Sequence, residues 1–280
     1  MPKFIKTCFH ILKYLYEVIR GLRDWARMFE LAGMGQGKPA LVVGNGPSQG
    51  YLTAAILQSF LDDGGAIFGV NYWHLNELIA AVPPTYLVIS DPVILSNSKI
   101  NDDIDSKNLS LIDYINKNKK TQIICPIHRC KELKEKFGTS RILGFIDTPL
   151  NLPFYTATAP ILPRSYCSMT LYKALAVASW MDYSSIYVIG MDNTYLRKLY
   201  SDINSRILFL SDYVTGKEFI CDESERYQCV GDCLVSLSES FYSAMRFSVN
   251  KNIVNIDEFS LTDAFPKVKF DQTFKKYIKD

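Results

Sequence analysis

Short apolar runs that alternate with helical segments constrain the fold of this chain more than any other feature. Runs of this kind predict strands at 40–43, 66–70, 85–89, 122–125, 141–145, 185–189 and 253–256. Helical patterns lie between them, at 52–61, 75–81, 109–116, 131–137, 168–181 and 233–249. Strands that are apolar on both faces are typical of parallel sheets covered by helices. The alternation therefore predicts an α/β fold, a Rossmann-like doubly wound and mainly parallel sheet.

Two regions of the chain depart from this alternation. Residues 3–32 carry apolar residues at helical spacing interrupted by Lys and Arg, and glycines at 33 and 35 end the pattern. Residues 191–233 show no steady period and are long for a connection, which favours a functional insert. We therefore expect an amphipathic N-terminal helix at 1–36. A Rossmann-like nucleotide-binding catalytic domain at 37–280 follows, with 191–233 as a lid or acceptor-binding insert.

Composition narrows the classes of function. The chain has 280 residues, of which 48% are hydrophobic, so it has the means to bury a core. A net charge of +2 gives no indication of nucleic-acid binding. The seven cysteines are scattered without a C-x-x-C pair, which favours a reducing, cytoplasmic compartment. The spacing of Cys125, His128 and Cys130 fits no zinc pattern, so we expect buried thiols and no metal.

The predicted N-terminal helix leaves two interpretations open. Positive charge is concentrated there, since residues 1–40 hold seven basic and three acidic side chains. No stretch of about 18 residues is free of charge, which excludes a membrane span. One interpretation is a helix packed on its own core or on a second subunit of a homo-oligomer. The other is an interfacial helix at 3–32, peripheral on the inner face of the cytoplasmic membrane.

A glycine-rich turn follows the first predicted strand. Its sequence is Gly44-Asn45-Gly46-Pro47-Ser48. Glycines allow a close approach of backbone and ligand, and Ser48 is suited to cap a following helix whose amides attract phosphate. The turn is not the dinucleotide fingerprint, because Gln49 stands where the third glycine belongs. A phosphate-binding turn and a simple tight turn both remain open here.

Polar residues also follow other predicted strands. Asn71 follows the second strand, Ser90 and Asp91 the third, and Gly190 and Asp192 the strand at 185–189. The carboxyl ends of parallel strands meet at one edge of a sheet, and ligands of such folds bind there. Several polar residues at one edge favour a nucleotide site over isolated turn formers.

These blocks resemble a known group of enzymes. They are Val-Val-Gly-Asn-Gly-Pro-Ser at 42–48, Asn71, Ile-Ser-Asp-Pro at 89–92 and Ile-Tyr-Val-Ile-Gly-Met-Asp at 186–192. In order and register they are similar to the bacterial CMP-sialic-acid sialyltransferases. They are equally similar to a looser group that includes flagellin nonulosonate transferases and archaeal hydroxymethylpterin diphosphokinases.

The resemblance implies a metal-independent glycosyltransferase without a cofactor. Its donor would be a CMP-sugar carrying sialic acid, Kdo or another nonulosonate, and its acceptor a glycan or lipid-linked glycan of bacterial surface polysaccharide. The nucleotide-binding residues carried over are Gly44, Asn45, Gly46, Pro47, Ser48, Asn71, Ser90, Asp91, Ser168, Thr170 and Gly190.

One departure from the sialyltransferases concerns the general base. They place a histidine in the insert, whereas the corresponding stretch here, 209–215, has none and Tyr213 stands at its position. Asp192, Asp212 and Tyr213 are the catalytic candidates that remain, and a buried carboxylate with a raised pKa is suited to be the base. Two alternatives stay open. They are an ATP-dependent pyrophosphate transferase of the pterin diphosphokinase type and a non-catalytic nucleotide- or glycan-binding relative.

Overall fold

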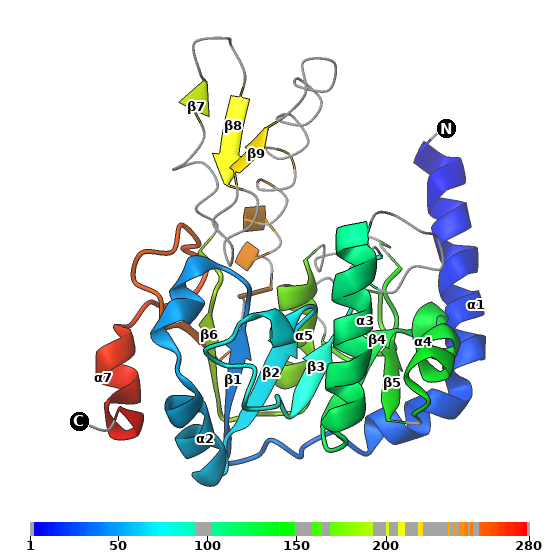
Figure 1. The fold of residues 1–280 in the computed structure, drawn as a ribbon. Coiled ribbons are helices and arrows are strands. Elements are labelled where there is room, and N and C mark those ends of the chain that lie inside the picture. Colours follow the sequence, from blue (N-terminus) through cyan, green and yellow to red (C-terminus); the bar gives the residue numbers. More distant parts are fainter. Residues whose placement is uncertain are drawn as a thin grey trace.

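A seven-stranded, entirely parallel sheet forms the centre of the protein in the computed structural model (Figure 1). The structure describes residues 3–92, 94, 102–139, 141–148, 150, 158–163, 169–192, 200–201, 207–210, 218–220, 235, 238, 241–242, 244–245, 247–248 and 252–278. The predicted α/β fold with a doubly wound parallel sheet is confirmed.

The strands lie in the order β10-β6-β1-β2-β3-β4-β5. Their bounds are β1 Pro39–Val43, β2 Ala66–Val70, β3 Tyr86–Val88, β4 Gln122–Pro126, β5 Ile142–Phe145, β6 Ser185–Ile189 and β10 Ile253–Asn255. Six of the strands are buried along their whole length or at all but one residue, as their apolar sequences predict.

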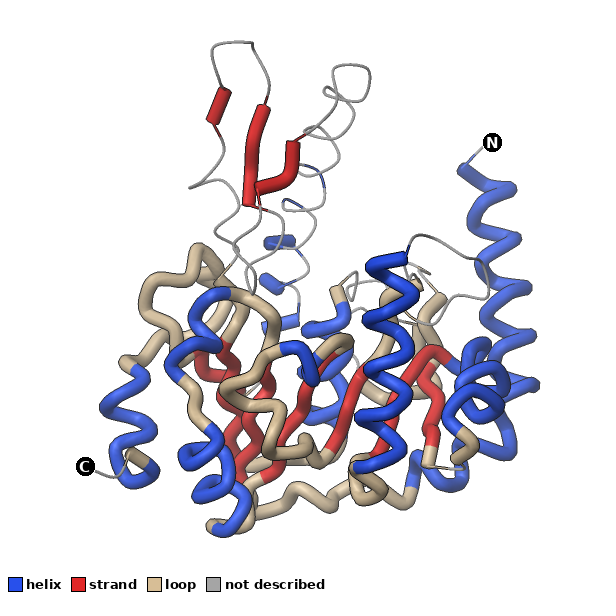
Figure 2. Tube along the Cα trace, in the orientation of Figure 1, coloured by secondary structure: helices blue, strands red, loops and turns tan. Residues whose placement is uncertain are grey.

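Helices cover both faces of the sheet (Figure 2). The helices are α1 Lys3–Phe29, α2 Ala54–Asp62, α3 Asp102–Lys117, α4 Cys130–Phe137, α5 Thr170–Trp180 and α7 Phe270–Phe274. Apolar side chains of α2, α3, α4 and α7 belong to one buried cluster, and those of α5 to a second. Described residues between 235 and 248 are helical, and Ala244 and Phe247 join the α5 cluster.

The direction of winding changes between β1 and β6. The chain runs outward from β1 through β2, β3, β4 and β5, and then returns along α5 to β6 on the other side of β1. The loops after β1 and β6 therefore start from neighbouring strand ends. Parallel folds of this kind bind ligands at such a switch point.

Helix α1 covers the β5 edge of the sheet (Figure 1). One side of α1 is buried, with Glu17, Trp25 and Met28 each no more than 5% exposed. Its N-terminal half extends past the sheet on the side where the strands end. A helix over an edge strand also shields backbone groups that would otherwise pair with another chain.

Two sequence predictions differ from the structure. The predicted helix at 75–81 is absent: a short 3-10 helix, Trp73–Leu75, is followed by turns at 77–81. The Asn76 side chain accepts a hydrogen bond from the Leu78 amide, and the Asn76 carbonyl accepts one from the Ile79 amide. Ser48 does not cap α2, because that cap is Thr53, whose Oγ1 accepts the Ile56 amide at 3.3 Å.

The segment 191–233, predicted to be a lid or acceptor-binding insert, contains three short antiparallel strands that its sequence did not predict. They are β7 Tyr200–Ser201, β8 Ile207–Leu210 and β9 Glu218–Ile220, in the order β7-β8-β9.

Within the part of the chain that the structure describes, no helix has the length and apolar character needed to cross a membrane.

Candidate functional site

A cavity of about 600 Å³ opens at the carboxyl ends of the strands, next to the switch point. Residues from six loops and from α5 line it. From the loops after β1, β2, β3 and β6 come Gly44, Asn45, Gly46, Asn71, Ser90, Asp91, Pro92, Gly190, Met191 and Asp192. From the loops after β4 and β5 come His128, Arg129 and Asp147, and Met169, Thr170, Leu171 and Lys173 belong to α5 and its start.

The loops after β1 and β6 are packed backbone against backbone. The Gly46 amide donates to the Gly190 carbonyl at 3.0 Å. A side chain at Gly44 or Gly190 would overlap the other residue's carbonyl, and one at Gly46 would overlap Asp192 Oδ2. Gly190 also has φ 75°, a left-handed conformation that favours glycine. The contact between the two loops is therefore enough to explain these glycines, without a bound ligand.

Ser48 and Asp192 link the same two loops through side chains. The Ser48 amide donates to Asp192 Oδ1 at 3.0 Å, and its hydroxyl donates to Oδ2 at 2.9 Å. Ser48 Oγ in turn accepts the Gly190 amide at 2.8 Å. The amides of Gly46 and Ser48 are thus bonded inside the protein. The turn leaves Asn45 exposed to a ligand. The backbone amide of Asn45 makes no hydrogen bond within the described part of the chain.

A second buried carboxyl group lies beside Asp192. Burial and the charge of Asp257 together raise the pKa of Asp192 to about 6, against the lowering effect of the two bonds from Ser48. Asp257 is 2% exposed, and its Oδ2 meets no hydrogen-bond donor in the described part of the protein. Two carboxyl groups so placed hold a proton between them more readily than either does alone.

Three polar side chains form the base of the cavity beside β2 and β3. Asn71 has φ 49°, and its Nδ2 donates to Thr170 Oγ1 at 3.2 Å. The hydroxyls of Ser90 and Thr170 lie 2.7 Å apart, and the Ser90 amide points to Asn71 Oδ1 at 3.4 Å. This triangle joins two strand ends to the first turn of α5 and presents amide and hydroxyl groups that suit a nucleoside.

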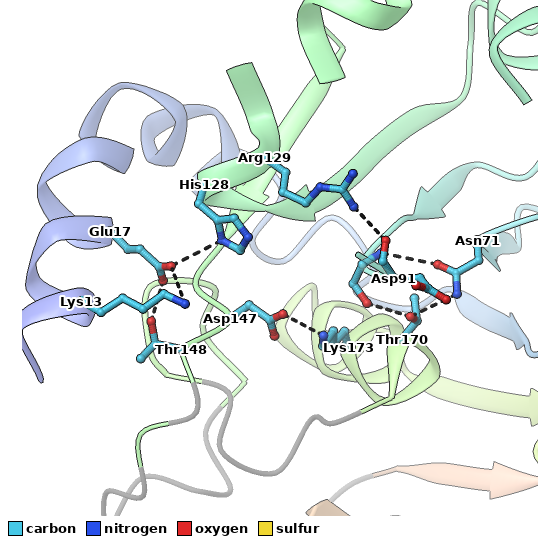
Figure 3. A network of polar contacts seen from close by, with 11 residues as sticks. Lys13, Glu17, Asn71, Asp91, His128, Arg129, Asp147, Thr148, Thr170 and Lys173 are labelled. Carbon is cyan, nitrogen blue, oxygen red and sulfur yellow. Dashed lines mark hydrogen bonds and ion pairs between the residues drawn. The ribbon is translucent and has the colours of Figure 1, made fainter. Parts of the chain in front are cut away.

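The opposite side of the cavity is charged. Lys173 is 6% exposed, and its Nζ pairs with Asp147 Oδ2 at 2.8 Å. Arg129 is also buried, and it donates to the Asp91 carbonyl at 2.8 Å, which fixes the loop after β3. The cavity therefore joins a neutral polar end to an end that holds two buried cations. Figure 3 shows the two ends and the contacts between them.

His128 connects the charged end of the cavity to α1 (Figure 3). Its Nδ1 lies 3.4 Å from Glu17 Oε1, and Glu17 Oε2 accepts the Thr148 hydroxyl at 2.7 Å. Lys13 Nζ lies 3.9 Å from the same carboxylate. Burial raises the pKa of Glu17, but the bonds from His128 and Thr148 and the charges of His128 and Lys13 outweigh it, so the pKa is lowered.

Other reactive side chains are placed away from the cavity. His74 is not among the cavity residues, its Nε2 lies 2.8 Å from Ser110 Oγ, and burial lowers its pKa to about 4. Cys125 and Cys130 are buried thiols 3.5 Å apart, as expected, and burial raises the pKa of Cys125. Among the described side chains, no three His, Cys, Asp or Glu gather as a metal would need.

The structure brings most of the predicted residues together. Lining the cavity are Gly44, Asn45, Gly46, Asn71, Ser90, Asp91, Thr170, Gly190 and Asp192. Ser48 lies behind the turn, bonded to Asp192, and Pro47 is exposed at the start of a short 3-10 helix. Ser168, Asp212 and Tyr213 lie outside the described residues.

The charged end of the cavity was missed by sequence reasoning. His128, Arg129 and Asp147 follow β4 and β5 just as Asn71 and Asp91 follow β2 and β3, so the rule of strand ends would have found them. For Lys173 the signal was a lone charge in the otherwise apolar helix α5.

No protein family and no curated protein matches this sequence. Among solved structures, the chain is similar to the MAf glycosyltransferase from Magnetospirillum magneticum AMB-1. The identity is 10% and the TM-score 0.46, over 82% of this chain and 33% of that one, so the chain spans about a third of that protein's length. At this level of similarity, function has to be argued from the site itself.

Proposed function

We propose that this protein is a glycosyltransferase that moves an acidic sugar of the sialic acid, Kdo or nonulosonate type from a CMP-sugar to a glycan or lipid-linked glycan. One observation carries the proposal. The cavity at the switch point joins the hydroxyl and amide groups of Asn71, Ser90 and Thr170 to the buried cation of Lys173. A CMP-sugar of this kind has a nucleoside at one end and anionic phosphate and carboxylate groups at the other.

Lys173 is suited to recognise one of those anionic groups. Its ammonium is already desolvated and held by Asp147, so a ligand anion meets a preorganised donor rather than a mobile surface lysine. The Asp147 side chain is 18% exposed, which gives a ligand access to the pair. Asn45 and Asn71 would hold the nucleotide at the other end.

His128 is proposed as the general base that the insert does not supply. Its Nδ1 faces the Glu17 carboxylate, which orients the ring. In transfer, the acceptor oxygen bonds to the anomeric carbon, and the bond from that carbon to the phosphate oxygen breaks. CMP leaves with the electron pair, and the acceptor proton passes to His128 Nε2. Asp192 is less suited to this role because both its oxygens accept hydrogen bonds from Ser48.

Thermal unfolding with CMP, CMP-N-acetylneuraminic acid, ATP and NAD, each with and without magnesium, tests the proposal. A ligand at about 100 times its dissociation constant adds about 2.7 kcal/mol of stability. We expect stabilisation by CMP and the CMP-sugar that does not need magnesium. A magnesium-dependent shift with ATP and none with CMP would contradict the proposal and support a pyrophosphate transferase.

Lys173→Met sharpens the test. We expect at least tenfold weaker binding of CMP-N-acetylneuraminic acid, measured by calorimetric titration. Lys173→Met also leaves Asp147 without its partner, so the double variant Lys173→Met/Asp147→Asn separates loss of binding from loss of folding. The matched control is Lys131→Met, because Lys131 is 78% exposed on α4. Unchanged affinity in the double variant would remove Lys173 from the donor site.

A further inference from the structure

The outward side of α1 carries a set of exposed apolar side chains that the proposed transfer reaction does not use. Each of them is between 40% and 68% exposed. They are Ile5, Phe9, Ile11, Leu12, Leu15, Tyr16, Ile19, Leu22 and Phe29, which we call the outer face of α1. Scattered surface leucines need no explanation, but a contiguous apolar surface of this length does.

Helical geometry places these residues on one stripe. At 3.6 residues per turn, their directions fall within an arc of about 160°, and the stripe is about 36 Å long from Ile5 to Phe29. The buried residues Glu17, Gly21, Trp25 and Met28 point to the opposite side, toward the protein. The helix thus has one face for its own sheet and another, exposed face, on which Phe29 also makes an edge contact with the Trp180 ring.

Charge indicates what covers the outer face. The sequence of α1 holds six Lys and Arg residues against two acidic ones, and one of those two, Glu17, is buried against the protein. Arg20 is directed to one border of the stripe by its helical position, and it is exposed. A helix with this excess of positive charge repels a second copy of itself and is attracted to an anionic surface.

We propose that the outer face of α1 docks onto an anionic lipid bilayer, with the helix axis in the plane of the headgroups. Its apolar side chains enter the boundary between headgroups and acyl chains, while Arg20 meets lipid phosphates. The helix lies on the bilayer and does not cross it. This surface is independent of the identity of the donor and acceptor.

Docking through the outer face would also place the cavity next to the bilayer. Glu17 lies on the inner side of α1 and contacts His128 and Thr148 at the cavity's charged end (Figure 3). The N-terminal half of α1 extends past the sheet on the side of the strand ends, where the cavity opens. A lipid-linked acceptor would reach the cavity without leaving the membrane surface.

Vesicle flotation of the full chain tests the proposal. We expect the wild type to float with vesicles of equimolar phosphatidylglycerol and phosphatidylcholine, and much less with pure phosphatidylcholine. The variant Leu12→Gln/Ile19→Gln/Leu22→Gln should bind the anionic vesicles at least tenfold more weakly, since three inserted side chains are lost. Arg20→Gln should weaken binding about fivefold at low salt, the effect of one basic residue near such a surface.

The matched control is Leu78→Gln/Leu109→Gln/Phe259→Gln, whose side chains are 56–66% exposed outside α1. It should float like the wild type, and thermal unfolding should show both triple variants folded. Absence of flotation with anionic vesicles would overturn the proposal, as would equal loss in the two triple variants or equal binding to neutral vesicles. A dimer in sedimentation that the α1 variant dissociates, without flotation of the wild type, would assign the face to a second copy.

Discussion

Two buried carboxyl groups have opposite pKa shifts, although each is at most 6% exposed. They are Glu17, on the inner side of α1, and Asp192, behind the glycine-rich turn. Burial raises the pKa of both. At Glu17, contacts with His128, Thr148 and Lys13 reverse the effect, whereas at Asp192 the neighbouring Asp257 adds to it. Burial alone therefore does not decide the charge of a carboxyl group in this protein. The partner brought to it by the fold does.

The two regions also differ in what holds them together. At Glu17, helix α1 is joined to the sheet edge by polar side chains and by the buried apolar residues Trp25 and Met28. At Asp192, two loops are in backbone contact, and glycines make that contact possible. Substitutions should consequently be tolerated better at the helix than at the turn.

The largest expected effect is at Gly190. Gly190→Ala adds a side chain at φ 75° against the Gly44 carbonyl, so we expect a loss of about 3 kcal/mol in the free energy of unfolding. The control Gly64→Ala, at φ 84° with no atom nearby, should lose only about 1 kcal/mol. Urea unfolding measures both. Equal losses would mean that backbone strain, rather than contact between the loops, explains the glycine.

An intermediate effect is expected at Glu17. Glu17→Gln keeps an acceptor for Thr148 but removes the charge that His128 and Lys13 face, at a cost of about 2 kcal/mol at pH 7. Since the pKa of Glu17 is lowered by folding, its contribution is present above its ordinary value near 4.5 and is lost as the pH falls through the folded value. Stability measured against pH should show the two proteins converging in acid, and a gap that stays constant from pH 7 into acid would contradict the assigned role of the charge.

The smallest expected effect has the opposite sign. Asp257→Asn keeps an acceptor for the Phe259 amide and replaces the charge next to Asp192, so we expect a gain of about 1 kcal/mol at pH 7. Because folding raises the pKa of Asp192, this group carries its stabilising proton fully below about pH 4 and loses it as the pH rises through about 6. The gain in stability from Asp257→Asn should therefore develop between these two pH values. If it is already present at pH 4, the charge of Asp257 is not its cause.

Much of the fold was predictable because it depends on local patterns. Apolar runs such as Ala66–Val70 are strands in the structure with the predicted bounds, since only a doubly covered parallel sheet buries them. The helix at 75–81 was predicted wrongly because Asn76 turns the backbone through its side chain, a preference that hydrophobic spacing does not reveal.

The candidate site was predictable in part for the same reason. Residues at strand ends, including Asn45, Asn71 and Asp91, lie around one cavity because parallel strands end at one edge. By itself, the sequence determined the sheet, its edge of polar residues and the amphipathic character of α1, because each follows from spacing along the chain. Only the tertiary structure decided that Ser48 bonds Asp192, that Lys173 pairs with Asp147, and that Glu17 reaches His128. The partners in these three pairs are between 26 and 144 residues apart in the sequence, so only long-range packing brings them together.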